Sequence, residues 1–260
     1  MSTKVIMFAN QKGGVGKTTS VFEISNILAK KGREVLMIDL DAQCNLTECS
    51  GVQPKRSQSI YDTIMGSSSF ENAIIKVKDH LDILPGHRKM LSQYFVGADD
   101  VTALKEAREY IENYKKYNYI IIDVGPEAGQ LMTMAMLASD YVVAVTTLSK
   151  LAYSGVVQMC ADLIKGREHY KDFQVKPLGI LLNNVKKITV ADVNKEKFED
   201  LKSEFGAEIF STEIKSSCVL DECKEFFQSL NDYKPSHPIA KAFVALTDEI
   251  EERITESEGR

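Results

Sequence analysis

The sequence predicts an α/β fold: one doubly wound, mostly parallel sheet with helices on both faces. Two features of its 260 residues lead to this prediction. Short segments without a polar face alternate with segments of helical periodicity, and strands that are apolar on both faces belong to sheets covered by helices on both sides. A glycine-rich loop also stands between the first strand and the first helix. Because we find no internal repeat, low-complexity stretch or linker, we expect residues 1–260 to form a single domain.

The chain begins with a buried strand at residues 4–9, KVIMFA. Residues 18–31 follow as a helix because their apolar side chains recur at helical spacing, and Gly32 is placed to end it. Two further apolar runs predict strands at residues 34–39, EVLMID, and 81–86, LDILPG, where Pro-Gly ends the run.

The middle of the chain continues this alternation. Residues 101–114 are predicted to form an amphipathic helix. Strands are predicted at residues 117–123, YNYIIID, and 141–147, YVVAVTT. A helix from about residue 153 to residue 166 leads to another apolar run at 177–184, PLGILLNN, which predicts a further strand.

The last quarter is more polar. Residues 194–204 predict a charged helix, and AEIFSTEI at 207–214 predicts the last strand. Two helices, near 218–230 and 237–253, are expected to finish the chain.

Composition limits the class of protein. The net charge is −5, and residues 248–260 carry six acidic and two basic side chains, so the remainder is close to neutral. This is not the footprint of a strongly basic nucleic-acid binder. The five cysteines lack metal-ligand spacing, which favours free thiols in a reducing compartment. No apolar run is long enough to span a membrane and no signal peptide is evident, so we expect a cytoplasmic protein.

Residues 10–19, NQKGGVGKTT, predict a phosphate-binding loop. The general pattern is G-x-x-x-x-G-K-[ST] between a strand and a helix. Gly16, Lys17 and Thr18 fit it, whereas Gln11 stands where the first glycine is usual. Backbone N–H groups can surround phosphates here, Lys17 can reach the β- and γ-phosphates, and Thr18 can bind Mg²⁺. The nucleotide-binding residues predicted in this loop are Lys12, Gly13, Gly14, Val15, Gly16, Lys17, Thr18 and Thr19.

Lys12 is a second lysine in the loop, and its position leaves two interpretations. It is either a solvent-exposed loop lysine or a second cation directed at the γ-phosphate, from its own subunit or from a partner.

Polar residues at predicted strand ends are further candidates, because ligands gather at the carboxyl ends of parallel strands. Asp39 and Asp41 lie two apart and can face the same way, although turn capping explains either one alone. Asp123 can hold Mg²⁺ or cap a helix. Asn183 and Asn184 can contact an adenine edge or form an Asx turn.

Several motifs together resemble the ParA/MinD superfamily of deviant Walker ATPases. KGGVGKTT resembles its phosphate loop, VLMIDLDAQCNLT at 35–47 resembles its DxDPQxN segment, and YIIIDVGPEAG at 119–129 resembles its strand-terminal aspartate. SIYDTIMG at 59–66 and LDILPG are also similar to partition ATPase segments. The resemblance covers nearly the whole chain and implies a P-loop NTPase type of fold.

The resemblance also implies residue roles. Lys12 would be the signature lysine, which reaches the phosphates across a nucleotide-sandwich homodimer. Asp41 would position the attacking water, and Asp39 would lie near the Mg²⁺ shell. The chain departs from the family at Ala42 and Gly125, where proline is usual.

The function that the resemblance implies is that of a ParA/Soj-type partition ATPase. Such an enzyme hydrolyses ATP with Mg²⁺, slowly without its partner. Its ATP dimer binds DNA non-specifically, associates with the nucleoid and is regulated by a centromere-binding ParB-like protein. The alternative is a membrane- or protein-cargo-positioning ATPase of the MinD-like branch. MinD proteins end in a basic amphipathic helix, whereas this chain ends in DEIEERITESEGR, so we expect no stable membrane anchor. An electron-transfer ATPase like the nitrogenase iron protein would need cluster cysteines that these five do not match.

The expected DNA surface departs from the family pattern. IKSSCVLDEC at 214–223 replaces a stretch that carries arginines in many partition ATPases, and only Lys215 is basic. The candidates for DNA phosphate contacts are instead Lys186, Lys187, Lys195 and Lys197, with Lys165 and Arg167 as further basic residues.

Overall fold

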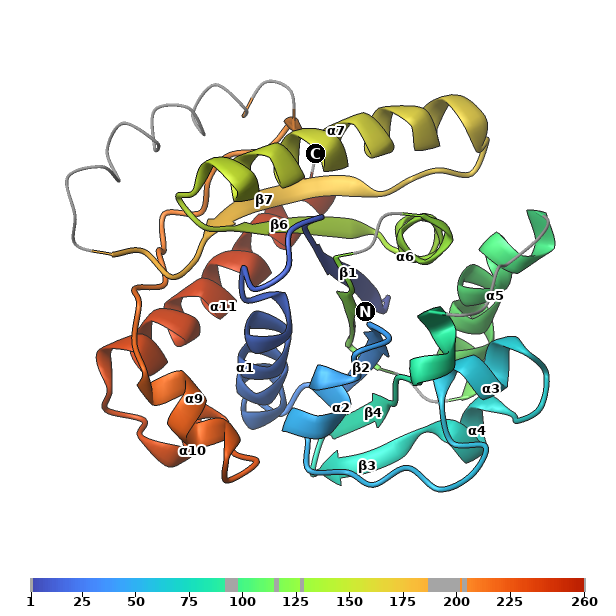
Figure 1. Ribbon diagram of the computed structural model, residues 1–260, viewed down its shortest axis with the longest axis horizontal. Helices are drawn as coiled ribbons and strands as arrows, with labels where there is room; N and C mark the ends of the chain where they lie inside the picture. The colour runs from blue at the N-terminus through green and yellow to red at the C-terminus, as the bar shows by residue number, and fades with distance from the viewer. Residues whose placement is uncertain are drawn as a thin grey trace.

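A computed structural model describes residues 2–91, 98–114, 117–126, 129–186, 202 and 205–259. Within these ranges, seven strands form one sheet in the order β3-β4-β2-β5-β1-β6-β7 (Figure 1). Every neighbouring pair is parallel except β3 with β4, which confirms the mostly parallel, doubly wound sheet. The strands are β1 (Lys4–Ala9), β2 (Val35–Leu40), β3 (Ile75–Lys78), β4 (Leu81–Leu84), β5 (Tyr119–Val124), β6 (Tyr141–Thr146) and β7 (Lys176–Leu182).

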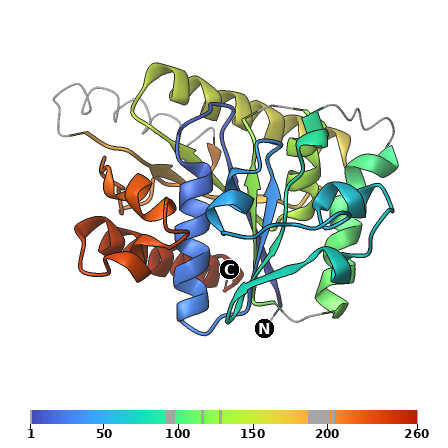
Figure 2. The ribbon, with the colours of Figure 1, turned by 60° about the horizontal axis from the view of Figure 1, so that its bottom comes forward.

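Helices cover both faces of the sheet, as Figure 2 shows for α1 and α5 on opposite sides of the strands. Buried apolar side chains of the described residues form one cluster with α5, α6 and α7 and another with α1 and α11. No described helix is both long and apolar enough to cross a membrane. The helices are α1 (Lys17–Lys30), α2 (Asn45–Cys49), α3 (Ile60–Ile64), α4 (Phe70–Ala73), the 3₁₀ helix η1 (Arg88–Leu91), α5 (Ala98–Tyr114), α6 (Gln130–Ala138), α7 (Lys150–His169), α9 (Val219–Lys224), α10 (Leu230–Tyr233) and α11 (Pro238–Glu258).

The prediction of a strand at 207–214 was wrong. This segment runs beside β7 but makes only isolated bridges, Ile180 with Ile209 and Val185 with Lys215. The ladder is interrupted because the N–H groups of Ser211 and Thr212 donate instead to the carboxylate of Glu249 on α11, at 2.8 and 3.1 Å. The N–H groups of Phe210 and Ile214 still donate to β7, but that of Thr212, which lies between them in register, is taken by a side chain from a distant helix.

The predicted helix at 218–230 is two short helices, α9 and α10. Phe227 lies between them with φ 52°, a left-handed conformation that ends a right-handed helix. Ser229 then starts α10, because its side chain accepts a hydrogen bond from the N–H of Asp232. The predicted helix at 194–204 lies outside the described residues, apart from residue 202.

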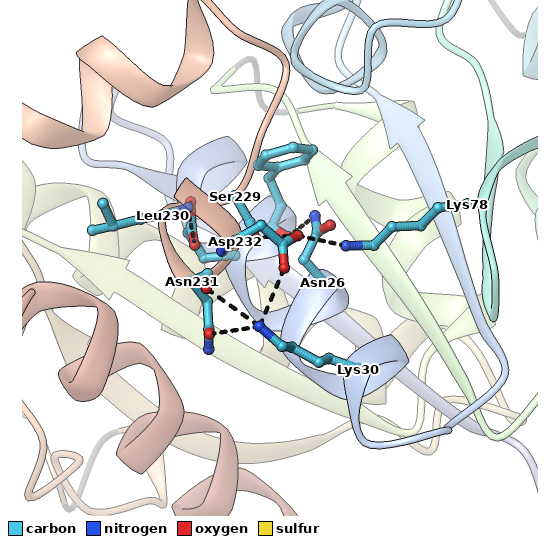
Figure 3. A network of polar contacts seen from close by, with 9 residues as sticks. Asn26, Lys30, Lys78, Ser229, Leu230, Asn231 and Asp232 are labelled. Atoms are coloured by element: carbon cyan, nitrogen blue, oxygen red, sulfur yellow. Dashed lines mark hydrogen bonds and ion pairs between the residues drawn. The ribbon is translucent and has the colours of Figure 1, made fainter. Parts of the chain in front are cut away.

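A polar network joins α10 to α1 and to the edge strand β3 (Figure 3). The Asp232 carboxylate accepts from Lys78 Nζ at 2.8 Å and from Lys30 Nζ at 3.3 Å. Lys30 Nζ also donates to the backbone and side-chain oxygens of Asn231, both at 3.3 Å. This network fixes the segment that follows α9 against the body of the protein.

Candidate nucleotide-binding site

The loop between β1 and α1 leaves the amino terminus of α1 open. Gly16 precedes the helix with φ 95°, and no described side chain caps the helix there. Gly14 has φ 74°, so both residues need the conformational freedom of glycine. A Cβ atom on Gly16 would also overlap Asn183 Nδ2. The free N–H groups of the first turn, together with the positive end of the helix dipole, form a phosphate-binding arrangement.

Asn10 fixes the first half of the loop. It is fully buried, its Nδ2 donates to Val145 O at 2.8 Å and Ala152 O at 3.3 Å, and its Oδ1 accepts from the N–H of Lys12 at 2.9 Å. Gly155 on α7 makes this approach possible, because a Cβ atom there would overlap Asn10 Oδ1. The backbone that carries Lys12 is therefore anchored to β6 and α7.

The two loop lysines have opposite environments. Lys17 is buried, and its Nζ donates to Asn10 O at 3.2 Å and Lys12 O at 3.4 Å. Burial lowers the pKa of Lys17 below its ordinary value, and the charges of Asp123 and Asp41 oppose this shift. The Lys12 side chain is exposed, and in the described part of the chain its ammonium makes no hydrogen bond or ion pair.

Thr18 and Asp123 form a pair beside the loop. Thr18 Oγ1 donates to Asp123 Oδ2 at 2.6 Å. Asp123 is fully buried, and its other oxygen, Oδ1, accepts no hydrogen bond from any described residue. Burial raises the pKa of Asp123 to about 8, and the charge of Asp39 on the neighbouring strand adds to the shift. A buried carboxylate oxygen without a donor, next to a hydroxyl, is suited to a cation or to the water that such a cation holds.

Asp39 and Asp41 differ in what they contact. Asp39 is fully buried; its Oδ1 accepts from Asp41 N at 3.2 Å, and its Oδ2 accepts from the N–H and hydroxyl of Thr47 at 2.8 and 2.6 Å. Burial raises the pKa of Asp39 to about 6, although these hydrogen bonds oppose the shift. Asp41 Oδ1 accepts from Gln43 N at 2.9 Å.

A cavity of about 760 Å³ opens in front of the loop. One side is formed by the loop with Asp41 and Pro126, and another by Asn183 and Asn184 at the end of β7. Asn183 Nδ2 donates to Val15 O at 2.7 Å, so this amide supports the loop. Asn184 is exposed and has φ 53°. Another part of the lining comes from α2 and the residue pair before it, with Gln43, Asn45, Glu48 and Cys49. The other lining residues lie after residue 214: Lys215, Ser216, Ser217, Leu220, Asp221, Lys224, Glu225 and Phe227.

Comparison with known proteins agrees with this geometry. A family model described as an AAA domain matches residues 3–175, more than half of the chain. The chain belongs to this family, in its ParA/MinD branch of deviant Walker ATPases. The chromosome-partitioning ATPase Soj of Thermus thermophilus is 29% identical to it over 252 residues, covering 97% of each chain.

Solved structures confirm the P-loop NTPase type of fold. A variant of McdA from Cyanothece in complex with ATP has a TM-score of 0.83 at 19% identity and covers 98% of both chains. The septum site-determining protein MinD of Pyrococcus horikoshii, complexed with Mg-ADP, has a TM-score of 0.77 at 23% identity and covers 95% of this chain and 96% of its own.

Sequence reasoning did not identify two parts of the site in this ParA-family ATPase. Thr47 bonds to Asp39 from α2, and its only signal was its place in the segment 35–47. The wall at residues 215–217 follows the predicted strand 207–214, so the rule that ligands gather at strand ends could have indicated it. The family resemblance indicates only a DNA surface for this stretch.

The candidate DNA-contacting lysines are only partly placed. Lys186 is exposed just beyond β7, and Lys165 and Arg167 are exposed on α7. Lys187, Lys195 and Lys197 lie outside the described residues.

Proposed function

We propose that this chain is an ATP-dependent homodimer switch for plasmid or chromosome partitioning, built as one domain over residues 1–260. The observation that carries the proposal is the loop geometry: the open α1 amino terminus, the buried Lys17 and Thr18 line one cavity, and Thr18 donates to the buried Asp123 behind it. The name of the Thermus relative, a chromosome-partitioning ATPase, supports partitioning as the process served.

The residues present fit Mg²⁺. Thr18 supplies a hydroxyl oxygen and Asp123 supplies a buried Oδ1 that no described donor satisfies. These are the oxygen ligands that Mg²⁺ prefers, directly or through water. Bound Mg²⁺ would neutralise charge on the β- and γ-phosphates. The P. horikoshii relative, complexed with Mg-ADP, supports the assignment of a nucleotide and this metal.

The chain's own groups divide the work of hydrolysis. The α1 amino terminus and Lys17 would bind the phosphates. Asn183 and Asn184 line the cavity and are the candidates for contacts with the adenine base of ATP. Asp41 lies in the same cavity, where its carboxylate can orient a water for attack on the γ-phosphorus. Lys12 is exposed and is not among the described residues that line the cavity. It would complete the site of the opposing subunit, so hydrolysis would require the dimer.

The first test of ATP binding is Lys17→Ala. We expect its affinity for ATP to fall by at least about tenfold, because a buried charge-assisted contact to phosphate is lost. Isothermal titration calorimetry measures the affinity. Lys241→Ala, which removes an exposed lysine on α11, is the matched control. Unchanged ATP affinity in Lys17→Ala would contradict the proposed site.

The proposed output is ATP-dependent, sequence-independent DNA binding. Lys186 is exposed just beyond β7, Lys187 follows it in the sequence, and a two-fold dimer would duplicate any patch that they form. If a dimer neutralises about four phosphates, the slope of log K against log salt should be about −3.6. Such binding would associate the ATP dimer with the nucleoid, and a centromere-binding ParB-like protein would regulate it.

The DNA experiment uses the ATP-bound state of Asp41→Ala, which should hydrolyse ATP slowly because the carboxylate that orients the water is removed. Fluorescence anisotropy at several salt concentrations, with ATP and with ADP, measures binding. Lys186→Glu with Lys187→Glu should weaken binding equally across sequences and leave ATP affinity unchanged. The control pair is Lys55→Glu with Arg56→Glu, which reverses two adjacent exposed charges elsewhere. If this state binds no DNA at low salt, the MinD-like alternative, an ATPase that positions protein or membrane cargo, is favoured instead.

A further inference from the structure

Three segments of the chain meet at the buried carboxylate of Asp39. Asp39 lies on β2. Its carboxylate accepts a hydrogen bond from the N–H of Asp41, at the start of the following turn, and two hydrogen bonds from Thr47 on α2. The resemblance placed Asp39 near the Mg²⁺ shell, yet the hydrogen bonds of both its oxygens are made to the loop that carries Asp41. The hydrogen bonds of Asp39 therefore hold the loop that carries Asp41 in its conformation.

Thr47 connects this carboxylate to a third segment. Its hydroxyl donates to Asp39 Oδ2 at 2.6 Å and accepts from the N–H of Gly86, beyond β4, at 3.0 Å. Gly86 packs without room for a side chain, because a Cβ atom there would lie 2.9 Å from Asp39 Cγ and 3.1 Å from Asp41 O. One hydroxyl thus uses both its donor and an acceptor to join α2 to the ends of β2 and β4.

Asp41, the first residue of this loop, lines the cavity. Its Oδ1 accepts from Gln43 N, and the backbone of Gly125 beyond β5 packs against it so closely that a Cβ atom would lie 3.1 Å from this oxygen. Cys44 N donates to Asp41 O at 2.9 Å, and Cys44 has φ 57°, which is strained for a residue with a side chain. A strained turn needs contacts on both sides to keep its conformation.

We propose that Thr47 is a positioning residue for ATP hydrolysis: its hydroxyl holds, through Asp39 and Gly86, the turn that presents Asp41 to the γ-phosphate. This inference rests on the proposed ATPase function. The phosphate loop is held by other contacts: Asn10, Lys17 and Asn183 donate to backbone oxygens, and Thr18 donates to Asp123. None of them involves Thr47. Loss of the hydroxyl should therefore slow hydrolysis and leave ATP binding intact.

The test is Thr47→Val, which replaces the hydroxyl by a methyl group of similar size. We expect kcat to fall by about tenfold to a hundredfold, the range for loss of a hydrogen bond to a charged group. The dissociation constant for ATP, measured by calorimetry, and the Mg²⁺ concentration for half-maximal activity should each stay within about threefold of wild type. Thr47→Ser keeps the hydroxyl and should restore kcat to within about twofold. Thr247→Val is the matched control: it removes a buried hydroxyl on α11 that, among the described residues, bonds only to Phe243 O.

A readout independent of activity is hydrogen exchange at the Gly86 amide. This N–H loses its acceptor in Thr47→Val, so it should exchange faster there, while Thr47→Ser should resemble wild type. If Thr47→Val does not fold, Thr47→Ala undergoes the same measurements.

Two results would overturn the inference. The first is a kcat within about twofold of wild type in the variant without the hydroxyl. The second is a kcat of Thr47→Ser that is as low as that of Thr47→Val. The proposed function fails separately, if wild type shows no Lys17-dependent ATP binding.

Discussion

Lys12→Ala is expected to bind ATP as wild type does and to hydrolyse it about 10² to 10³ times more slowly. One preorganised cation or donor at developing charge contributes roughly 3–4 kcal/mol to transition-state stabilisation. Binding should survive because Lys17 and the open amino terminus of α1 remain in place. Single-turnover hydrolysis and calorimetry separate the two effects, and Lys176→Ala, an exposed lysine at the start of β7, controls for general loss of charge.

The structure gives a reason to expect that Lys12 acts across a dimer. Its backbone is fixed by Asn10, yet its side chain is exposed and is absent from the described residues that line the cavity. A lysine with an anchored backbone and an exposed side chain is able to reach another subunit. Within its own subunit, the buried Lys17 already occupies the cation position.

Mixing two inactive variants distinguishes the two arrangements. A mixed dimer of Lys12→Ala and Asp41→Ala subunits has one complete site if Lys12 acts in the opposing subunit, and none if it acts in its own. Random mixing at equal concentrations should therefore restore about a quarter of wild-type activity. Activity no higher than that of either variant alone would place Lys12 in its own site or remove it from the mechanism.

The sequence predicts those parts of the fold in which a short stretch of residues shows by itself that it is buried. β2 and β6 are buried at every position, and the apolar runs VLMI and YVVAV within them indicated strands of a covered sheet. β3 gave no such signal, because Ile75–Lys78 is a short edge strand with alternating lysines. The segment 207–214 gave a false signal, since Glu249, far along the chain, takes two of its N–H groups.

In the site, too, the features that depend on neighbouring residues could be predicted, and the contacts between distant residues could not. The loop from Gly13 to Thr19 follows from its motif, because spacing alone brings a helix terminus, a lysine and a hydroxyl together. The contact of Asn183 with Val15, and the link from Thr47 to Gly86, depend on elements that meet only in the folded chain. No local pattern encodes such pairs, so sequence reasoning could name Asn183 but could not determine what its amide bonds to.

We expect the free energy of unfolding of Glu23→Gln, measured relative to that of wild type, to be larger at pH 8 than at pH 5. Glu23 lies on α1 and is 2% exposed. Its two carboxylate oxygens accept from the N–H of Leu230, at 2.9 and 3.0 Å, at the start of α10. Burial raises the pKa of Glu23 to about 7, and the nearby charge of Asp232 adds to the shift, while Lys224 opposes it.

The direction follows from the proton balance. In the unfolded chain Glu23 ionises near its ordinary value of 4.5, whereas the folded protein keeps the proton until about pH 7. The folded state therefore binds more protons between these values, and stability is lost as pH rises through them. Glutamine keeps the shape and one carbonyl acceptor but cannot ionise, so this loss disappears. Between pH 5 and pH 8 the free energy of unfolding of Glu23→Gln should gain about 2 to 3 kcal/mol relative to wild type.

Urea unfolding of both proteins at pH 5 and pH 8 measures this difference. Any cost of the unpaired amide N–H₂ group is the same at both pH values, and the titration of Asp39 and Asp123 is common to both proteins, so each cancels. Glu109→Gln, which removes an exposed carboxylate from α5, controls for the change in net charge. A difference between Glu23→Gln and wild type that does not change with pH would show that Glu23 ionises in the folded protein as it does in the unfolded chain. Its contacts with Leu230 would then fully compensate its burial, and α10 would be held to α1 equally well across this pH range.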